Sequence, residues 1–275
     1  MVEHYIGQFK CRNHVIDFDG QHVKVMGIVN VTPDSFSDGG VNLDKDNAVR
    51  NAIKMFEAGV DIIDVGGEST RPGYTEVSTE EEIERVCLVI ERISHETDAI
   101  ISIDTYKPKV AEAALRSGAH ILNDVTGFCL PEMRALAVQY KAGAVAMYNN
   151  RLFANDGQSI LDKMDSFAIN ICDKIPSNLI LDPGIGFGTA PNEDVAMMHH
   201  FEKWRKIAAS PILLGLSRKR MVGNFMRRAS EPLERDKATI GADLAGVTLG
   251  ADIIRVHDVI GAIDSLRLWE AILNT

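Results

Sequence analysis

The chain has 275 residues, of which 45% are hydrophobic and 25% charged, and it holds 22 Gly, 9 Pro and 4 Cys. This composition excludes a disordered, collagen-like or disulfide-stapled protein. Lys and Arg number 29 against 39 Asp and Glu, and the resulting formal net charge of -10 argues against a nucleic-acid partner. No apolar run approaches the roughly 20 residues that span a bilayer, and the N-terminus lacks the features of a signal peptide. We therefore expect a cytoplasmic protein with no membrane partner.

A short pattern recurs along the chain, in which a glycine is followed by an apolar run. The glycine can take the left-handed conformation that ends a helix, and the apolar run suits a strand buried on both faces. The pattern occurs at Gly59, Gly118, Gly143 and Gly250. It predicts a repeated unit of one strand and one helix.

Eight strands are expected in all, separated by stretches with helical periodicity. Ser78 and Glu81 form a capping box before one helix, and Pro108 suits the first turn of another. This alternation indicates an α/β protein with a (β/α)8 TIM barrel, formed by residues 1–275 as a single domain in which residues 1–24 are a short N-terminal β-hairpin region. The expected strands begin near Val25, Ile62, Ile100, Ile121, Ala144, Leu179, Ile212 and Ile253.

The alternative architecture is an open doubly wound sheet. Such a sheet binds dinucleotides through a G-x-G-x-x-G turn. Residues 184–188 read Gly-Ile-Gly-Phe-Gly instead, and they follow an Asp-Pro pair. Because the chain also lacks a Walker lysine loop, the barrel is favoured.

Seven of the expected strands end abruptly in polar residues. In a TIM barrel the carboxyl ends of the strands form the active site. A single Asp there is often only a helix cap or a turn residue. A whole ring of polar groups is costly to bury unless a ligand or mutual pairing satisfies it. The residues are Asn30, Asp64, Asp104, Asn123, Asp124, Asp182, Ser217, Arg218, Lys219, Arg255 and His257.

These polar residues separate into two groups. Asp104, Asn123 and Asp182 come from middle strands, where carboxylates and an amide can clamp a flat heterocycle with an amino-pyrimidine edge. The second group favours an anion, and barrels of this class often bind phosphate near the last two strands. The pattern predicts a planar base at the centre and a phosphorylated tail at one side. The second group, from the adjacent first and last strands, comprises Asn30, Arg255 and His257.

Two loops are longer than usual for this fold, and both are rich in Gly, Pro and Ser. They span residues 32–43 and 66–78. Loops of this length and composition typically act as lids over an active site. The alternative interpretation is a pair of solvated linkers.

Six motifs occur in order along the chain: Met26-Gly-Ile-Val-Asn-Val-Thr-Pro-Asp-Ser-Phe-Ser-Asp-Gly-Gly40, Ile63-Asp-Val-Gly-Gly-Glu-Ser-Thr-Arg-Pro-Gly73, Ile101-Ser-Ile-Asp-Thr105, Leu181-Asp-Pro-Gly-Ile-Gly-Phe-Gly188, Ser217-Arg-Lys219 and Ile254-Arg-Val-His-Asp258. Together they resemble the motifs of the dihydropteroate synthases, a family of pterin-binding enzymes. The resemblance runs from about Val25 to the C-terminus, and six ordered matches are not a chance event.

The resemblance implies a folate-pathway transferase. Its reaction would join 6-hydroxymethyl-7,8-dihydropterin diphosphate to 4-aminobenzoate, releasing diphosphate and 7,8-dihydropteroate by a dissociative substitution. The resemblance also implies Mg²⁺ as the cofactor, these two small molecules as the substrates, a homodimer, and a target of sulfonamides.

By position in the motifs, the resemblance implies a role for each site residue. The pterin would be held by Asp64, Asp104, Asn123, Met147, Asp182 and Lys219. The diphosphate would be held by Asn30, Arg71, Arg255 and His257, with Asn30 as the Mg²⁺ ligand. The aminobenzoate pocket would be built by Thr70, Arg71, Pro72, Phe187, Lys219 and Arg220. The residues expected to act in catalysis are Asp34, Arg71, Lys219, Arg255 and His257.

The chain departs from the family pattern at two places. The fifth strand usually ends in Met-His in the family, and here it reads Met147-Tyr148-Asn149-Asn150. Many relatives carry Ser after the lysine of the seventh strand, at a helix start suited to a carboxylate. This chain has Arg220 there, which either pairs with aminobenzoate or points to solvent.

Two other functions fit parts of the pattern. A methyltransferase that uses methyltetrahydrofolate could share the carboxylate and amide clamp, but it would not need Thr70, Arg71, Pro72, Lys219 and a diphosphate site together. A catalytically silent pterin-binding paralogue would have no use for a leaving-group site. The residues predicted to form that site are all present, so the synthase is favoured.

Overall fold

The computed structural model describes residues 3–31, 41–68, 76–153, 157–175 and 177–273. At its centre is an eight-stranded parallel sheet with the strand order β8-β7-β6-β5-β4-β3-β10-β9. The outermost strands of this order meet through a parallel bridge between Leu181 and Ile212, and the Leu181 N–H donates to the carbonyl of Pro211 at 3.0 Å. The sheet therefore closes into a barrel, as predicted, and the open-sheet alternative is wrong. The strands are β3 Lys24–Asn30, β4 Ile62–Gly66, β5 Ile100–Asp104, β6 Ile121–Asp124, β7 Gly143–Met147, β8 Leu179–Asp182, β9 Leu213–Leu214 and β10 Ile253–Val256.

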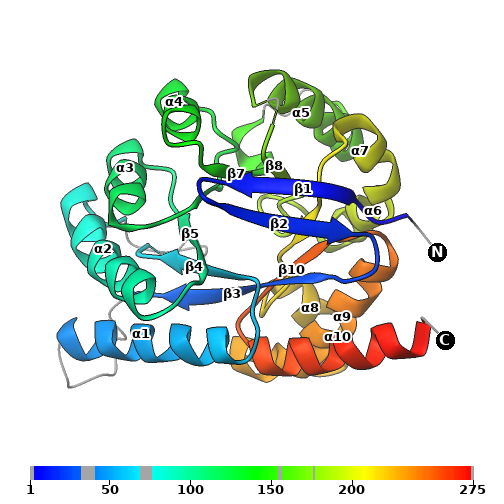
Figure 1. Cartoon of the computed structure of the whole chain (residues 1–275). Helices are drawn as coiled ribbons and strands as arrows, with labels where there is room; N and C mark the ends of the chain where they lie inside the picture. Colours follow the sequence, from blue (N-terminus) through cyan, green and yellow to red (C-terminus); the bar gives the residue numbers. More distant parts are fainter. Residues whose placement is uncertain (1–2, 32–40, 69–75, 154–156, 176, 274–275) are drawn as a thin grey trace.

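Helices surround the barrel on its outside (Figure 1). The predicted helix starts hold, since the Ser78 side chain accepts the N–H of Glu81 at 3.2 Å and Pro108 is the first residue of α3. The reciprocal half of the expected capping box is replaced, because Glu81 pairs with Arg85 one turn on. The helices are α1 Val41–Glu57, α2 Thr79–Glu96, α3 Pro108–Ser117, α4 Pro131–Tyr140, α5 Ile160–Lys174, α6 Pro191–His199, α7 Phe201–Ala208, α8 Arg220–Phe225, α9 Asp236–Thr248 and α10 Val259–Leu273, with short 3-10 turns η1 Asn150–Leu152 and η2 Pro232–Arg235.

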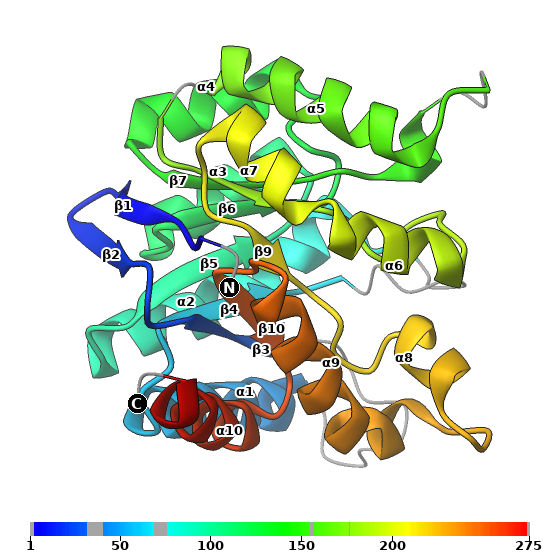
Figure 2. The same ribbon diagram turned by 90° about the vertical axis from the view of Figure 1, so that its right-hand side faces the viewer.

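The expected N-terminal hairpin is present as β1 Ile6–Cys11 paired antiparallel with β2 His14–Asp19. It lies across one end of the barrel, opposite α8, as Figure 2 shows. One face of the hairpin is buried in a single apolar cluster with an inward-facing side chain from seven of the barrel strands, and Ile100 of the eighth packs against it. Gly143 at the start of β7 must be a glycine, because a Cβ there would collide with the Phe9 ring. The cluster comprises Phe9, Cys11, Ile16 and Phe18 with Met26, Ile62, Ile121, Val145, Ile180, Leu213 and Ile253.

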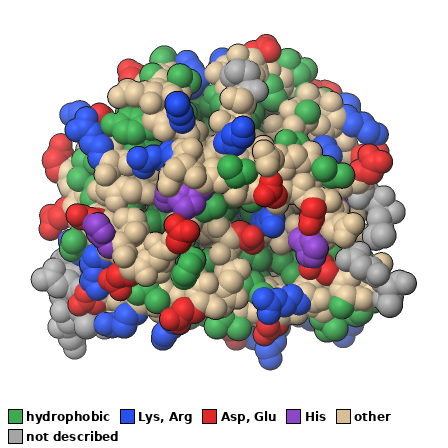
Figure 3. All heavy atoms as spheres, in the orientation of Figure 1, with side chains coloured by type: hydrophobic (Ala, Val, Ile, Leu, Met, Phe, Trp, Pro, Cys, Tyr) green, Lys and Arg blue, Asp and Glu red, His purple; other side chains and the backbone are tan. Residues whose placement is uncertain are grey.

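The hairpin seals the amino-terminal end of the barrel with apolar side chains, so the chemistry is left to the opposite end. Basic, acidic and apolar side chains are intermixed on the hairpin face of the molecule (Figure 3). No helix among the described residues is long and apolar enough to cross a bilayer.

Candidate active site

The barrel interior is built in two layers by the alternation of side chains along each strand. Residues two apart on a strand face the same side. The apolar residues that contact the hairpin face inward, and two positions further along the same strands the inward-facing residues become polar. Ile62 is followed by Asp64, Ile121 by Asn123, and Ile180 by Asp182. This upper layer comprises Asp64, Ser102, Asp104, Asn123, Asp182 and Arg255.

Arg255 lies between two of the predicted carboxylates. Its Nε donates to Asp64 Oδ2 at 2.7 Å, and one of its terminal nitrogens donates to Asp104 Oδ2 at 2.6 Å. Asn123 Nδ2 donates to the same Asp64 oxygen at 3.1 Å. Four residues predicted from separate strands therefore form one hydrogen-bonded cluster.

The cluster has an acceptor without a donor. Asp64 is fully buried, and among the described residues its Oδ1 has no hydrogen-bond partner, although Oδ2 has three polar neighbours. Ser102 pairs in register with Asp64 on the neighbouring strand, and its buried hydroxyl also has no partner in the part of the chain that the structure describes. Buried polar atoms are normally hydrogen-bonded, and leaving one unpaired costs about 1–3 kcal/mol. The barrel thus presents an unsatisfied carboxylate oxygen and a hydroxyl to whatever enters it.

Asp182 and Lys219 lie beside this cluster. Asp182 Oδ1 accepts the N–H of Gly184 at 2.7 Å. A Cβ placed on Gly215 would lie 3.8 Å from Lys219 Nζ and 4.0 Å from both Asp182 Oδ2 and Arg255 Cβ. These three side chains therefore surround Gly215. Because this residue has no side chain, it does not fill the space between them.

Burial and mutual charge shift the pKa values in this layer. Burial raises the pKa of Asp104 to about 7. The positive charge of Arg255 offsets this effect only in part, and the negative charge of Asp64 adds to it. The pKa of Asp182 is also raised by burial, against the opposing charge of Lys219. Burial lowers the pKa of Lys219 to about 8, although Asp182 opposes the shift. The shifts follow from placing three carboxylates and two cations in one dry region.

Of the four residues predicted to hold the diphosphate, Asn30, Arg255 and His257 lie among the described residues, and Arg255 points elsewhere than the sequence suggested. His257 Nδ1 lies 2.8 Å from Ser217 Oγ, and that oxygen also accepts the backbone N–H of His257 at 3.1 Å. Asn30 is exposed at the end of β3. Arg255 directs its guanidinium to the Asp64 and Asp104 carboxylates instead, so it joins the residues predicted to hold the pterin.

The described part of the predicted aminobenzoate pocket is centred on a half-buried aromatic ring. Lys219 Nζ lies 4.8 Å from the centroid of Phe187 and donates to the carbonyl of Ile185 at 2.7 Å. Arg220 is exposed at the start of α8. Met147 is buried at the end of β7, in register with Asp182. Asp34, Thr70, Arg71 and Pro72 lie outside the described residues.

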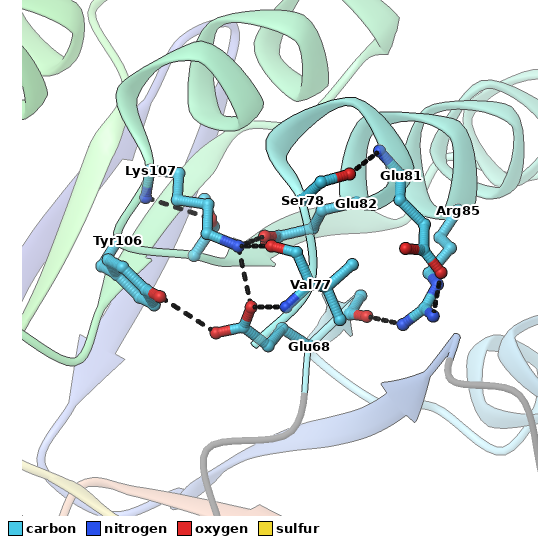
Figure 4. A network of polar contacts seen from close by, with 10 residues as sticks. Glu68, Val77, Ser78, Glu81, Glu82, Arg85, Tyr106 and Lys107 are labelled. Carbon is cyan, nitrogen blue, oxygen red and sulfur yellow. Dashed lines mark hydrogen bonds and ion pairs between the residues drawn. The ribbon is translucent and has the colours of Figure 1, made fainter. Parts of the chain in front are cut away.

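A buried ionic network that the sequence did not predict lies at the base of the second long loop (Figure 4). Lys107 Nζ donates to Glu68 Oε2 at 2.7 Å and to Glu82 Oε2 at 2.8 Å. Glu68 also accepts the N–H of Val77 at 2.8 Å and the hydroxyl of Tyr106 at 3.1 Å. The carboxylate thereby joins residue 68 to residue 77 and fixes both ends of the chain segment between them.

The sequence contains only a weak indication of this network. Glu68 falls inside a family motif, and Lys107 precedes the proline that starts α3. Neither position predicts that the two side chains meet. Charge pairing raises the pKa of Lys107 despite burial, and it lowers the pKa of Glu68. Both carboxylates are nearly inaccessible, with side-chain exposures of 3% for Glu68 and 1% for Glu82.

Comparison with known proteins places this architecture in a family. Residues 26–257 match the family model described as pterin binding enzyme. The chain is 44% identical over 262 residues to a dihydropteroate synthase of Clostridium beijerinckii, which covers 93% of this chain and 96% of that protein. The fold and the polar upper layer define a TIM-barrel protein with a ligand-binding site at the carboxyl ends of its strands. The chain belongs to the pterin-binding enzyme family.

Solved structures of dihydropteroate synthases share the fold. The Xanthomonas albilineans enzyme with 4-aminobenzoic acid gives a TM-score of 0.89 at 34% identity, covering 98% of both chains. The enzyme from that organism in complex with 7,8-dihydropteroate gives a TM-score of 0.87 at 32% identity, covering 98% of this chain and 100% of that one.

Replacing Lys107 with Met is expected to destabilise the protein strongly. The substitution leaves Glu68 and Glu82 buried without a cation, and breaking a buried ion pair in this way costs about 3–5 kcal/mol. Urea denaturation measures the change in the free energy of unfolding. The matched control is Lys206→Met, which removes an exposed pair with Glu202. Equal stabilities for the two variants would show that the network does not hold the loop base.

Pterin affinity is expected to depend on pH through Asp104. Its carboxyl group, with a pKa of about 7, accepts ligand hydrogen bonds as an anion only above that pH. The affinity for 6-hydroxymethyl-7,8-dihydropterin should therefore rise by roughly tenfold from pH 6 to pH 8. Isothermal titration calorimetry checks this, and Asp104→Asn should flatten the profile. A wild-type profile that is already flat would exclude this carboxylate as the titrating group.

Proposed function

We propose that the protein is a dihydropteroate synthase, which condenses 6-hydroxymethyl-7,8-dihydropterin diphosphate with 4-aminobenzoate to give 7,8-dihydropteroate and diphosphate. The observation that carries the proposal is the buried polar layer around Asp64, whose Oδ1 lacks a donor within the described segments of the chain. A pterin ring supplies N–H donors along one edge. Family membership and the high coverage of relatives named dihydropteroate synthase support the same reaction.

The upper layer of the barrel would recognise the pterin by charge and shape. Asp64, Asp104 and Asp182 offer carboxylate oxygens, and the amide of Asn123 is already oriented by its bond to Asp64. Hydrogen bonds to charged acceptors contribute about 1.5–3 kcal/mol each. Met147 would pack against the ring, and Lys219 would cover its open side. Filling the orphaned acceptor removes a cost that the free protein carries.

The anionic end of the substrate would lie toward the diphosphate residues Asn30, Arg71, Arg255 and His257. Of these, Asn30 and His257 lie at the carboxyl ends of adjacent strands, β3 and β10. Mg²⁺ takes oxygen ligands and is commonly held by one or two protein groups plus substrate phosphates and water. A single exposed amide oxygen at Asn30 fits that donor set. Bound there, Mg²⁺ would neutralise charge on the departing diphosphate.

The reaction would proceed by loss of the leaving group before attack. The C–O bond to the diphosphate breaks with its electron pair going to the leaving oxygen, and the positive charge on the exocyclic methylene spreads into the dihydropterin. The lone pair of the arylamine then forms the new C–N bond, and the amine proton passes to solvent. Arg71, Arg255 and His257 would stabilise the anion, and Asp34 the cation or the amine. The arylamine is unprotonated near neutral pH and needs no strong base.

The second substrate would bind over Phe187 and Lys219, with Arg220 and the loop residues Thr70, Arg71 and Pro72 completing the pocket. The cation–π geometry at Phe187 supports a site for an aromatic anion, since the ring gives a flat apolar wall and the ammonium group gives charge. A sulfonamide that mimics 4-aminobenzoate would compete there.

We propose that the protein forms a homodimer and is located in the cytoplasm. Large apolar side chains are exposed on α8, η2 and α10, which lie next to α9. Such exposure favours a protein interface, and a second copy of the chain is the proposed occupant. Sedimentation equilibrium tests this, because a monomer at micromolar concentration would overturn it. The residues are Phe225, Leu233, Ile260 and Leu268.

The purified protein is expected to form 7,8-dihydropteroate from the two substrates in the presence of Mg²⁺. Chromatography measures this product, and the release of diphosphate is measured in the same reaction. Arg255→Ala removes the cation shared by Asp64 and Asp104 and should lower kcat/KM by roughly 100-fold or more, in the range for losing one electrostatic group in an active site. The folded state of the variant is checked by thermal melting.

Other outcomes point to the two other functions. Pterin binding that is independent of diphosphate, without product under any condition, would indicate a silent binding protein. Consumption of methyltetrahydrofolate in the presence of a corrinoid protein would indicate a methyltransferase. Either result would contradict the synthase proposal.

A further inference from the structure

The loop after β7 is hydrogen-bonded to the loop after β8. The contact involves residues 147–150, the segment in which the chain departs from the family's Met-His pattern. Asn150 Nδ2 donates to the carbonyl of Gly188 at 2.8 Å, and Tyr148 donates its hydroxyl proton to Asn150 Oδ1 at 2.9 Å. Gly188 packs closely against Arg151, the residue after Asn150, since a Cβ on Gly188 would lie 2.8 Å from Arg151 Cγ. The two loops are therefore fixed relative to each other.

This contact places Arg151 beside the predicted aminobenzoate pocket. Its guanidinium carbon lies 5.3 Å from the centroid of Phe187, and Lys219 Nζ lies 4.8 Å from the same centroid. One aromatic ring thus has two cations within cation–π range. The loop that carries Phe187 is held independently of them, because Asp194 Oδ1 accepts the Gly186 N–H at 2.9 Å and the Thr189 hydroxyl at 2.5 Å.

The two cations differ in what they already bind. Lys219 donates to the carbonyl of Ile185 and lies near Asp182. Arg151 is exposed, and within the described parts of the chain no carboxylate forms an ion pair with its guanidinium. A guanidinium presents several donors in a planar fork that matches a carboxylate. An arylamine lying against Phe187 would bring its carboxylate within reach of that fork.

We propose that Arg151 is a specificity-determining residue that binds the carboxylate of the second substrate and selects 4-aminobenzoate over uncharged arylamines. The inference rests on the proposed synthase function. It assigns a role to the segment that replaces the family pattern, because Tyr148 and Asn150 hold Arg151 in place while the imidazole of that pattern is absent.

The test compares Arg151→Met, which keeps an apolar stem over Phe187, with Arg151→Lys, which keeps the charge. Steady-state kinetics give KM for 4-aminobenzoate and for dihydropterin diphosphate, and inhibition constants are measured for 4-aminobenzamide, the uncharged analogue. Losing a charge-assisted hydrogen bond predicts a rise in KM for 4-aminobenzoate of roughly 10-fold or more in Arg151→Met, with a smaller rise in Arg151→Lys. KM for the pterin substrate and the inhibition constant of the amide should stay within about twofold.

The matched control is Arg50→Met, since Arg50 is exposed on α1 and its guanidinium donates to Asn47 Oδ1. An equal weakening of 4-aminobenzoate and 4-aminobenzamide in Arg151→Met would overturn the inference, because it would mean that the side chain only supports Phe187. Unchanged KM values would overturn it as well. Failure of the proposed function is distinguishable, since it appears in the wild-type protein as no dihydropteroate at all.

Discussion

The guanidinium of Arg255, shared between the carboxylates of Asp64 and Asp104, is the interaction on which the interior of the barrel depends. Its nitrogens lie 2.7 Å from Asp64 Oδ2 and 2.6 Å from Asp104 Oδ2, and these bonds link three strands. The positive charge offsets the free-energy cost of burying two carboxylates. The compensation is incomplete. Asp182 adds a third carboxylate, and one oxygen of Asp64 stays unpaired. That imbalance raises the pKa of Asp104 and leaves the site ready for a ligand that donates hydrogen bonds.

The fold keeps this polar layer at one end of the barrel. Alternation along the strands sets an apolar layer beneath it, where Met26, Ile62 and Val145 pack against the hairpin. The polar residues can then occupy the next inward positions without opening the core to water from below. Outside the barrel, the ionic network of Lys107, Glu68 and Glu82 fixes the base of the second loop. Structural stability and a prepared binding site are thus obtained from different parts of the molecule.

The sequence was sufficient to predict the barrel, the hairpin and the start of nearly every strand, because period-2 and period-3.6 patterns and glycine punctuation are local signals. It also placed Asp64, Asp104, Asn123 and Asp182 at one mouth. It did not predict that Arg255 would turn toward the carboxylates. A long side chain chooses among partners from distant strands, and that choice depends on the charge of the whole cluster. For the same reason the Glu68–Lys107 pair was not foreseen: its residues lie 39 positions apart.

Pterin binding is expected to depend above all on the acceptor at Asp64 Oδ1, which lacks a donor among the described residues. The most direct measurement is calorimetric titration of 6-hydroxymethyl-7,8-dihydropterin into wild-type protein, Asp64→Asn and Asp243→Asn. Asp243 is the matched control, since it is a buried carboxylate on α9 that lies outside the polar layer and whose two oxygens also lack partners among the residues described. We expect Asp64→Asn to weaken binding by roughly 10-fold or more, whereas Asp243→Asn should bind as the wild type does. Wild-type affinity in a folded Asp64→Asn variant would contradict it.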